Sequence, residues 1–325
     1  MELKRFPSIP VLSAFLFLGF IYYVTVFIFI EDWLGLQTSA GSLNALICTF
    51  LASLCAFSFS VCAFTDPGGV PSSYVPDVEE NQISDQETKY TGVHRAQCDK
   101  CSTHRPPRTH HCRVCKRCVL KMDHHCIWIN NCVGHRNYKS FVVLIFYATI
   151  ASTYSATMII SCVLQKEWDS SQSLPLKIFY VGCGFMIAGL SLTLGTFLCW
   201  HIYLTAHNMT TIEYYEGKRA AWLARKSGLS YHHPFDVGVY KNITLVLGPN
   251  MLKWLWPTSS SHIKDGLNFP ATQQSHVRGS NPGRGDTSKV PNASSQEKGR
   301  LVMRRLSCSG PPWTSDLGPW GIVRV

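Results

Sequence analysis

Two short stretches of the chain place adjacent histidines directly before a cysteine. The first reads HHCRVC from His110 to Cys115, and the second reads KMDHHCIWINNC from Lys121 to Cys132. Cysteine and histidine are the usual side-chain ligands of structural zinc, and a cysteine beside a histidine also forms a nucleophile with its base. The two stretches are therefore compatible with metal binding, with cysteine chemistry, or with both.

The cysteines are concentrated in one segment. Of the fourteen in the chain, seven fall between residues 98 and 132: Cys98, Cys101, Cys112, Cys115, Cys118, Cys126 and Cys132. Reduced thiols in two C-x2-C pairs with histidines nearby predict zinc sites, and two tetrahedral sites need eight ligands. If each site takes three cysteines and one histidine, one cysteine remains. If all seven cysteines and one histidine close both sites, no nucleophile remains.

Local geometry favours one cysteine as the free one. In an extended chain, residues i and i+2 share a face, so His124 and Cys126 would lie together while His125 points away, towards a metal. Asp123 would then stand next to His124 and orient it. Because a loop need not be extended, this argument gives the two histidines different roles without excluding plain zinc ligation.

Four apolar runs are long enough to cross a bilayer, which takes about 20 residues: Val11–Ile30, Ser42–Phe64, Phe141–Leu164 and Leu176–Ala206. They predict an all-α polytopic membrane protein with a small zinc-stabilised, cysteine-rich domain between the second and third helices. The ten Lys and Arg residues of segment 92–140 and those after residue 206 predict, by the positive-inside rule, that this domain and both termini are cytosolic.

These features divide the chain into five parts. They are the N-terminus with two helices (1–64), a linker with the cysteine-rich domain (65–140), two more helices (141–206), a membrane-proximal region (207–257) and a disordered tail (258–325). The net charge of +10 favours anionic lipid head groups or a phosphorylated ligand as partners. Helices on both sides hold the basic segment against the membrane, which argues against nucleic acid.

A longer pattern extends through the cysteine-rich segment. From Cys98 to Phe141 the chain reads C-x2-C-x3-R-P-x-R-x2-H-C-x2-C-x2-C-x4-D-H-H-C-x-W-x-x-N-C-x-G-x2-N-x3-F. DPG at Asp66–Gly68, TTIE at Thr210–Glu213 and a later stretch containing Asn242 follow the same order. This pattern resembles the DHHC family of protein S-acyltransferases (palmitoyltransferases), over roughly residues 1–255. The sequence looks like that of a plant member of the family.

The resemblance implies a role for each matching residue. One structural zinc would be held by Cys98, Cys101, His111 and Cys118, and the other by Cys112, Cys115, His125 and Cys132. Cys126 would be the nucleophile, His124 its base and Asp123 the residue that orients the base, with Thr211 against Asp123 and Asn242 in support.

The implied activity is transfer of a palmitoyl-type acyl group from acyl-CoA to protein cysteines by a ping-pong mechanism. Its substrates would be proteins with cysteines near the bilayer, and its compartment the Golgi, other endomembranes or the plasma membrane. Candidate acyl-CoA contacts are three cations and one aromatic residue at the membrane face: Lys121, Arg136, Lys139 and Trp128. Each is equally compatible with a solvated surface or, for Trp128, with core packing.

Three other protein classes compete with this hypothesis. A zinc-stabilised membrane scaffold without activity would use Cys126 as a ligand or dispense with it. A membrane-anchored RING-type ubiquitin ligase requires ligand spacings less compact than these. A transporter usually needs an intramembrane acid or base pair, which none of the four apolar runs contains.

Overall fold

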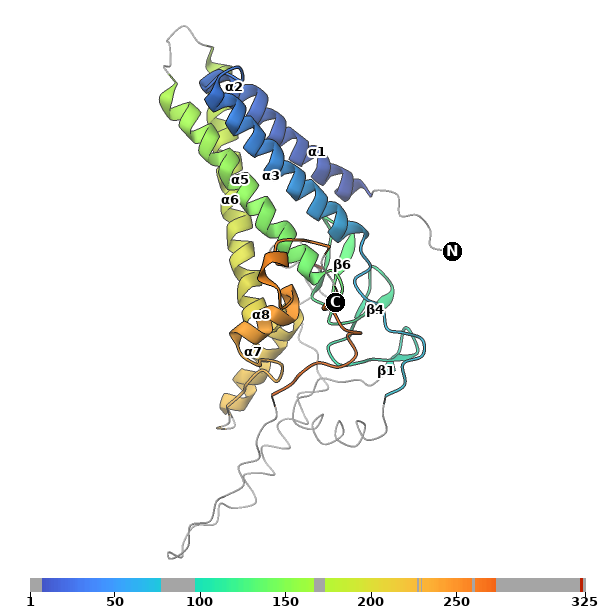
Figure 1. Cartoon of the computed structure of the whole chain (residues 1–325). Helices are drawn as coiled ribbons and strands as arrows, with labels where there is room; N and C mark the ends of the chain where they lie inside the picture. Colours follow the sequence, from blue (N-terminus) through green and yellow to red (C-terminus); the bar gives the residue numbers. More distant parts are fainter. Residues whose placement is uncertain are drawn as a thin grey trace, which may run out of the picture.

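The computed structural model describes the four long helices, the cysteine-rich domain and the segment that follows the last long helix. The described residues are 8–76, 97–166, 173–226, 228, 230–258, 261–272 and 322–323. Within them the four long helices lie side by side, and the strands and short helices gather at one end of the bundle (Figure 1).

The first long helix is continuous but not uniform. It consists of α1 (Ile9–Tyr23), a π-helical stretch η1 (Val24–Ile30) and one turn, α2 (Glu31–Trp33). The others are α3 (Ser39–Phe64), α5 (Tyr138–Gln165) and α6 (Leu174–Ala206). Each extends a few residues beyond its apolar run, because helix propagation continues into the flanking aromatic and polar residues.

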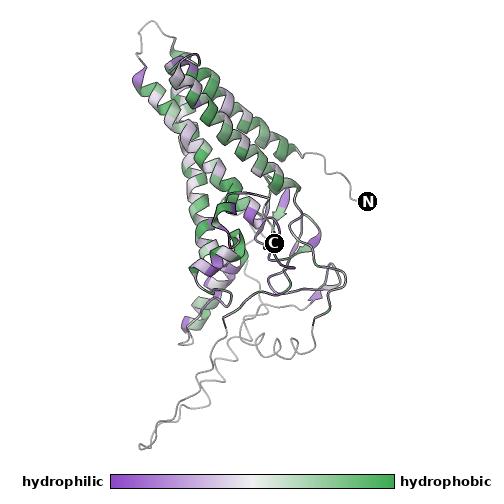
Figure 2. Cartoon of the chain, in the orientation of Figure 1, coloured by the Kyte–Doolittle hydropathy of each residue, from purple (hydrophilic) through white to green (hydrophobic). Residues whose placement is uncertain are grey.

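These helices are the only candidate membrane spans in the described part of the chain. Only 22% to 44% of the most apolar stretch of each span is buried inside the protein, and many large apolar side chains of these helices are exposed (Figure 2). A water-soluble protein rarely exposes apolar surface on this scale. The chain is a multi-pass membrane protein, and the expected fold class is confirmed.

Three small antiparallel hairpins form the cysteine-rich domain. They are β1 (Gln97–Cys98) with β2 (Thr103–His104), β3 (His110–Cys112) with β4 (Arg117–Val119), and β5 (His124–Cys126) with β6 (Asn131–Val133). A short strand β7 (Ile322–Val323) pairs with the other edge of β5. Each hairpin turn has one residue with positive φ, at Ser102, Lys116 and Asn130, and these follow one another at intervals of fourteen residues.

The DPG turn after α3 joins the bundle to this domain. Asp66 caps the turn through Gly68 N at 2.8 Å, and Gly68 O accepts a hydrogen bond from Leu120 N at 2.9 Å. A side chain at Gly134 would meet Val119 at 2.6 Å and Pro67 O at 2.9 Å, so only glycine fits this close approach.

After α6 the chain folds back against the cysteine-rich domain. It forms α7 (Thr211–Lys226), α8 (Val239–Leu247) and a short 3-10 turn, η2 (Met251–Lys253). Residues 261–272, assigned to the tail by the sequence, make specific contacts here: Thr272 donates to Asp236 O at 2.7 Å, and Phe269 packs on His135 and Phe235. Most of the predicted disordered tail lies outside the described residues.

Candidate active site and metal centres

The eight predicted metal ligands form two groups, and in each group the ligand atoms all lie within 4.8 Å of one another. His111 Nδ1 lies 3.2 to 3.9 Å from the Sγ atoms of its three cysteines, and His125 Nδ1 lies 3.4 to 3.7 Å from those of its own. Ligands bound tetrahedrally to one zinc at 2.0–2.3 Å would lie about 3.6 Å apart. The residues present therefore fit two structural zinc ions.

The two groups are interleaved along the chain. The first group is Cys98, Cys101, His111 and Cys118, and the second is Cys112, Cys115, His125 and Cys132. The middle hairpin, β3–β4, contributes ligands to both sites, while β1–β2 contributes only to the first and β5–β6 only to the second. Two ions would therefore lock the three hairpins to each other. Metal binding of this kind supplies folding free energy to a segment with little apolar core.

Cys126 belongs to neither metal group in the described residues. It ends strand β5, and the extended strand places His124 on the same face, with His125 on the opposite face among the metal ligands. His124 Nδ1 donates to Asp123 Oδ2 at 2.6 Å. The side chains of Asp123, His124 and Cys126 are all buried.

The Nε2 atom of His124 has no hydrogen-bond partner among the described residues, although the Cys126 thiol is close enough to influence its protonation. Burial would lower the pKa of His124, but Asp123 and Cys126 together raise it to about 9. Burial would raise the pKa of Cys126, but His124 and the backbone N–H groups of Ile129 and Trp128 outweigh this and lower it. The arrangement favours a thiolate beside an imidazolium.

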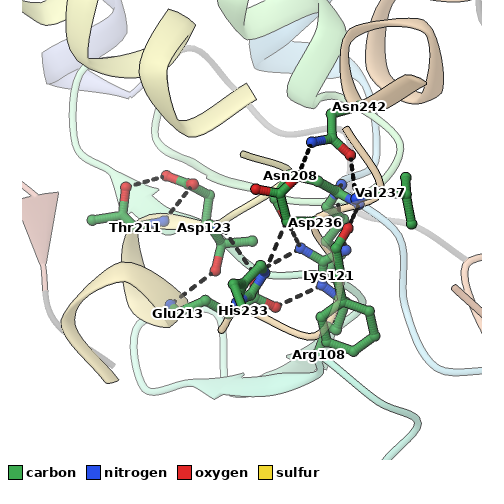
Figure 3. A network of polar contacts seen from close by, with 12 residues as sticks. Arg108, Lys121, Asp123, Asn208, Thr211, Glu213, His233, Asp236, Val237 and Asn242 are labelled. Carbon is green, nitrogen blue, oxygen red and sulfur yellow. Dashed lines mark hydrogen bonds and ion pairs between the residues drawn. The ribbon is translucent and has the colours of Figure 1, made fainter. Parts of the chain in front are cut away.

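Asp123 is held on its other side by the first turn of α7. Thr211 N donates to Asp123 Oδ1 and the Thr211 hydroxyl donates to Oδ2, both at 2.8 Å (Figure 3). Burial would raise the pKa of Asp123, but the hydrogen bonds from His124 and from Thr211 N outweigh it and keep it at about 2. A helix N-terminus carries partial positive charge, so this contact stabilises the carboxylate.

The nucleophile candidate faces apolar surface. Cys126 belongs to a buried cluster with Cys62 and Ala63 of α3 and with Phe141 and Val142 of α5. The His124 ring packs edge-on against Phe141, with centroids 5.1 Å apart. A thiolate at this position lies where the polar domain meets the apolar helices.

The four candidate acyl-CoA contacts have different surroundings. Lys139 is buried and donates to the carbonyls of Leu247 and Lys253 at 2.9 Å. Lys121 donates to Asn208 Oδ1 at 2.9 Å, and burial together with the Arg108 guanidinium lowers its pKa to about 7. Arg136 and Trp128 are exposed. The structure thus directs both lysines towards protein acceptors.

Asn242 is fully buried at the start of α8. Its side-chain amide donates to Ala206 O and to Asp236 Oδ1, both at 2.7 Å, and accepts from Val237 N at 3.1 Å (Figure 3). It joins the end of α6 to the segment that leads into α8. Its contacts support the region around α7 without reaching Cys126.

The sequence analysis assigned no role to several buried polar residues near the site. Arg108 forms an ion pair with Glu213 at 2.6 Å, and Asn131 donates to the last carbonyls of α3. His201 of α6 is fully buried, with its ring 6.1 Å from that of His124. The only sequence signal for any of them was the presence of Arg108 and Asn131 in the long pattern and of Glu213 in TTIE.

Comparison with known proteins identifies the family of the chain. The family model described as DHHC palmitoyltransferase matches residues 93–218. The chain is 59% identical over 258 residues to probable protein S-acyltransferase 15 of Arabidopsis thaliana, covering 79% of this chain and all of the relative. It is 50% identical over 264 residues to probable protein S-acyltransferase 16 of the same plant, covering 81% and 92%.

A rat protein, palmitoyltransferase ZDHHC15, is 37% identical over 179 residues, covering 53% of this chain and 49% of the relative. The chain belongs to the DHHC palmitoyltransferase family, in its plant branch.

Proposed function

We propose that the chain is a protein S-acyltransferase that moves a long-chain acyl group, palmitoyl above all, from acyl-CoA to protein cysteines through an S-acyl intermediate on Cys126. The single observation that supports this most is a buried cysteine that no metal group uses, on the same strand face as a histidine bonded to a carboxylate. Family membership points the same way.

In the first half-reaction the Cys126 thiolate attacks the thioester carbonyl of acyl-CoA. The C–S bond to CoA breaks, and the CoA thiolate leaves with the proton held on His124. In the second half-reaction a substrate cysteine gives its proton to His124 and attacks the acyl group, which restores the Cys126 thiolate. One thioester replaces another in both steps, so the enzyme lowers a barrier and needs little driving force.

The other groups position these reactants. Asp123 fixes the tautomer and orientation of His124, and Thr211 fixes Asp123. The zinc ions would be structural, because four protein ligands leave no open coordination position. The apolar cluster around Cys126 would receive the acyl chain, while the exposed Arg136 and Trp128 remain the candidates for contact with CoA.

We also propose that the cysteine-rich domain and both termini face the cytosol. Substrates would be proteins that present cysteines close to the bilayer, and the compartment would be the Golgi, other endomembranes or the plasma membrane. The density of Lys and Arg in and around segment 92–140 supports the orientation and would favour contact with anionic lipids.

The test is labelling of detergent-purified protein with radioactive palmitoyl-CoA, wild type beside Cys126→Ser, with zinc measured in both. Label on the wild type that neutral hydroxylamine removes, no label on the variant and equal zinc in both are the expected results. The alternative, an inactive zinc-stabilised scaffold, would be supported if neither protein were labelled and the variant had lost zinc.

A further inference from the structure

Arg108 lies in the loop between β2 and β3 and is almost wholly buried. Among the described residues it belongs to neither metal group, and its side-chain hydrogen bonds go to Glu213 and Asn208 instead of Asp123, His124 or Cys126. Its backbone has φ 64°, in the left-handed region that non-glycine residues adopt at a cost. Its side chain is 1% exposed. Contacts of the arginine must offset both the free-energy cost of the backbone conformation and that of burying the charge.

The guanidinium makes four hydrogen bonds, all to the segment after α6. Nε and Nη2 donate to the two carboxylate oxygens of Glu213, each at 2.6 Å. Nη2 also donates to Asn208 O at 2.7 Å, and Nη1 donates to Asn208 Oδ1 at 3.2 Å (Figure 3). The rings of Phe235 and Phe269 lie 4.4 and 4.9 Å from its central carbon.

Glu213 is also part of the helix start that holds Asp123. Its Oε2 accepts from Thr210 N at 2.9 Å, while Glu213 N donates to the Thr210 hydroxyl at 3.2 Å. This reciprocal pair is a capping box, which fixes the first turn of a helix. The same turn presents Thr211 N and its hydroxyl to Asp123.

The backbone of Arg108 touches the other side of the site. Its carbonyl accepts a hydrogen bond from Met122 N at 3.2 Å, one residue before Asp123. One residue therefore contacts both partners that must meet: the segment before β5 that carries Asp123, and the helix turn that binds its carboxylate. The two partners are 88 residues apart in the sequence.

We infer that Arg108 is a positioning residue for acyl transfer: it clamps the capped first turn of α7 against the cysteine-rich domain and thereby sets the geometry of Asp123 and His124. The inference rests on the proposed function, since its kinetic readout is acylation of Cys126. It adds a role for Arg108 and Glu213 that the reaction chemistry does not itself require.

Lysine cannot replace arginine in this clamp. A guanidinium binds a carboxylate through two parallel N–H donors and stacks between aromatic rings, whereas an ammonium is a point charge on a flexible stem. Arg108→Lys keeps the charge and loses the fork, so it separates geometry from electrostatics. Glu213→Gln weakens the same contact from the helix side and serves if Arg108→Lys does not fold.

The matched control is Arg117→Lys. Arg117 lies in the same domain and pairs with Asp66 at 2.7 Å, but both side chains are more than a third exposed. Exposed pairs contribute little. Zinc content and thermal stability of each variant in detergent establish which ones are folded.

Two measurements test the clamp. The first is the rate of hydroxylamine-sensitive labelling by palmitoyl-CoA over a range of concentrations. Displacing reacting groups by about 1 Å costs up to a factor of roughly 100. For Arg108→Lys we expect a 10- to 100-fold lower maximal rate, an unchanged half-saturating palmitoyl-CoA concentration, two zinc ions per chain and a normal melting temperature. For Arg117→Lys we expect a maximal rate and a half-saturating concentration within twofold of wild type, with two zinc ions per chain and the wild-type melting temperature.

The second measurement is hydrogen–deuterium exchange, which does not depend on activity. Faster exchange at residues 208–216 is expected in Arg108→Lys and not in Arg117→Lys. Unchanged exchange in a folded Arg108→Lys protein would overturn the inference, whether or not the wild type is labelled. A raised half-saturating concentration with an unchanged maximal rate would also overturn it, because Arg108 would then act on substrate binding. If the wild type itself takes no label, the proposed function fails, while the exchange result still decides on the clamp.

A double-variant cycle adds a third criterion. If Arg108 acts through the turn that carries Thr211, the losses caused by Arg108→Lys and Thr211→Val should not multiply in the double variant. Multiplying losses would mean that the two residues act independently, against the inference.

Discussion

The hairpin β3–β4 and the hairpin β5–β6 pair their strands in the same register, yet the cysteines that end their first strands differ. Cys112 is in a metal group, and Cys126 is in neither metal group of the described residues. Each begins with two histidines and a cysteine, and the second histidine of each is a metal ligand. The facing pairs are His110–Val119, His111–Cys118 and Cys112–Arg117 in one, and His124–Val133, His125–Cys132 and Cys126–Asn131 in the other.

The decisive difference lies three residues further on. Cys112 is followed by Cys115, whose backbone N–H donates to the Cys112 sulfur at 3.3 Å, and both are ligands of one metal group. Cys126 is followed at the same distance by Ile129, which is buried and apolar. The hairpin β5–β6 thus resembles a zinc-binding turn without its second cysteine. The backbone N–H groups of Trp128 and Ile129 still lower the pKa of the Cys126 thiol, and Cys126 belongs to neither metal group of the described residues.

The largest expected effect comes from changing the same position in both hairpins. Cys126→Ser should lower acyl labelling by a factor on the order of 10³ or more while leaving two zinc ions per chain, because only the nucleophile is lost. Cys112→Ser should lose zinc and the folded domain, since structural zinc contributes roughly 10 kcal/mol or more. Labelling kinetics and elemental analysis measure both. Equal zinc loss in the two variants would contradict the distinction.

Restoring the missing cysteine should blur the distinction. Ile129→Cys places a cysteine three residues after Cys126, as Cys115 follows Cys112. Together with the Nε2 atom of His124, the two cysteines give a soft metal three donors. We expect the zinc content to rise from two towards three per chain and acylation to fall about tenfold or more. Ile129→Val is the control for altered packing. Two zinc ions and full activity in Ile129→Cys would show that Ile129 is not what keeps Cys126 metal-free.

A moderate effect is expected at the first turn of α7, which binds Asp123 directly before hairpin β5–β6. Thr211→Val removes the hydroxyl that donates to Asp123 and keeps the backbone N–H. A hydrogen bond to a charged group contributes about 1.5–3 kcal/mol, so the labelling rate should fall roughly 10- to 100-fold. Thr244→Val, at an exposed hydroxyl of α8, should retain the wild-type rate. A Thr211→Val rate within twofold of wild type would contradict the prediction.

The smallest effect concerns stability and compares the residues that face the two cysteines. Asn131 donates to the carbonyls of Cys62, Ala63 and Thr65 at the end of α3, so Asn131→Ala should cost about 1–3 kcal/mol. Arg117→Ala removes an exposed ion pair and should cost less than about 1 kcal/mol. Thermal unfolding in detergent orders the two. The reverse order would mean that hairpin β5–β6 is not docked onto α3 through Asn131.

The sequence was most informative where a single residue type or a long run decides the outcome. The four spans followed from apolar length alone, and cysteine and histidine spacing predicted two zinc sites. The ligand sets of the two sites were implied by the family resemblance and agree with the two metal groups. The extended geometry of His124 and Cys126 was inferred from alternation along a strand and agrees with β5.

Contacts between distant segments were not predictable in the same way. Arg108 and Glu213 are separated by 105 residues, and no periodicity or spacing relates them. From the sequence, Lys139 was predicted to be a surface cation. Its hydrogen bond to the Leu247 carbonyl of α8 joins residues 108 positions apart, and no local pattern indicates such a contact. Phe269 lies in a segment of low hydrophobicity, which gave no signal for a packed residue. Its ring packs against the rings of His135 and Phe235, which lie far away in the sequence.

The distance of 88 residues between Asp123 and Thr211 has a consequence for the newly made protein. At about 5–20 residues per second of synthesis, the ribosome needs roughly 4–18 s to pass from one to the other. In that interval the cysteine-rich domain can acquire its metal, but α5 and α6 must still enter the membrane before α7 can return to Asp123. The contact between Thr211 and Asp123 therefore forms only after α6 has been made, and under the proposed function we expect no acylation by an incompletely inserted chain.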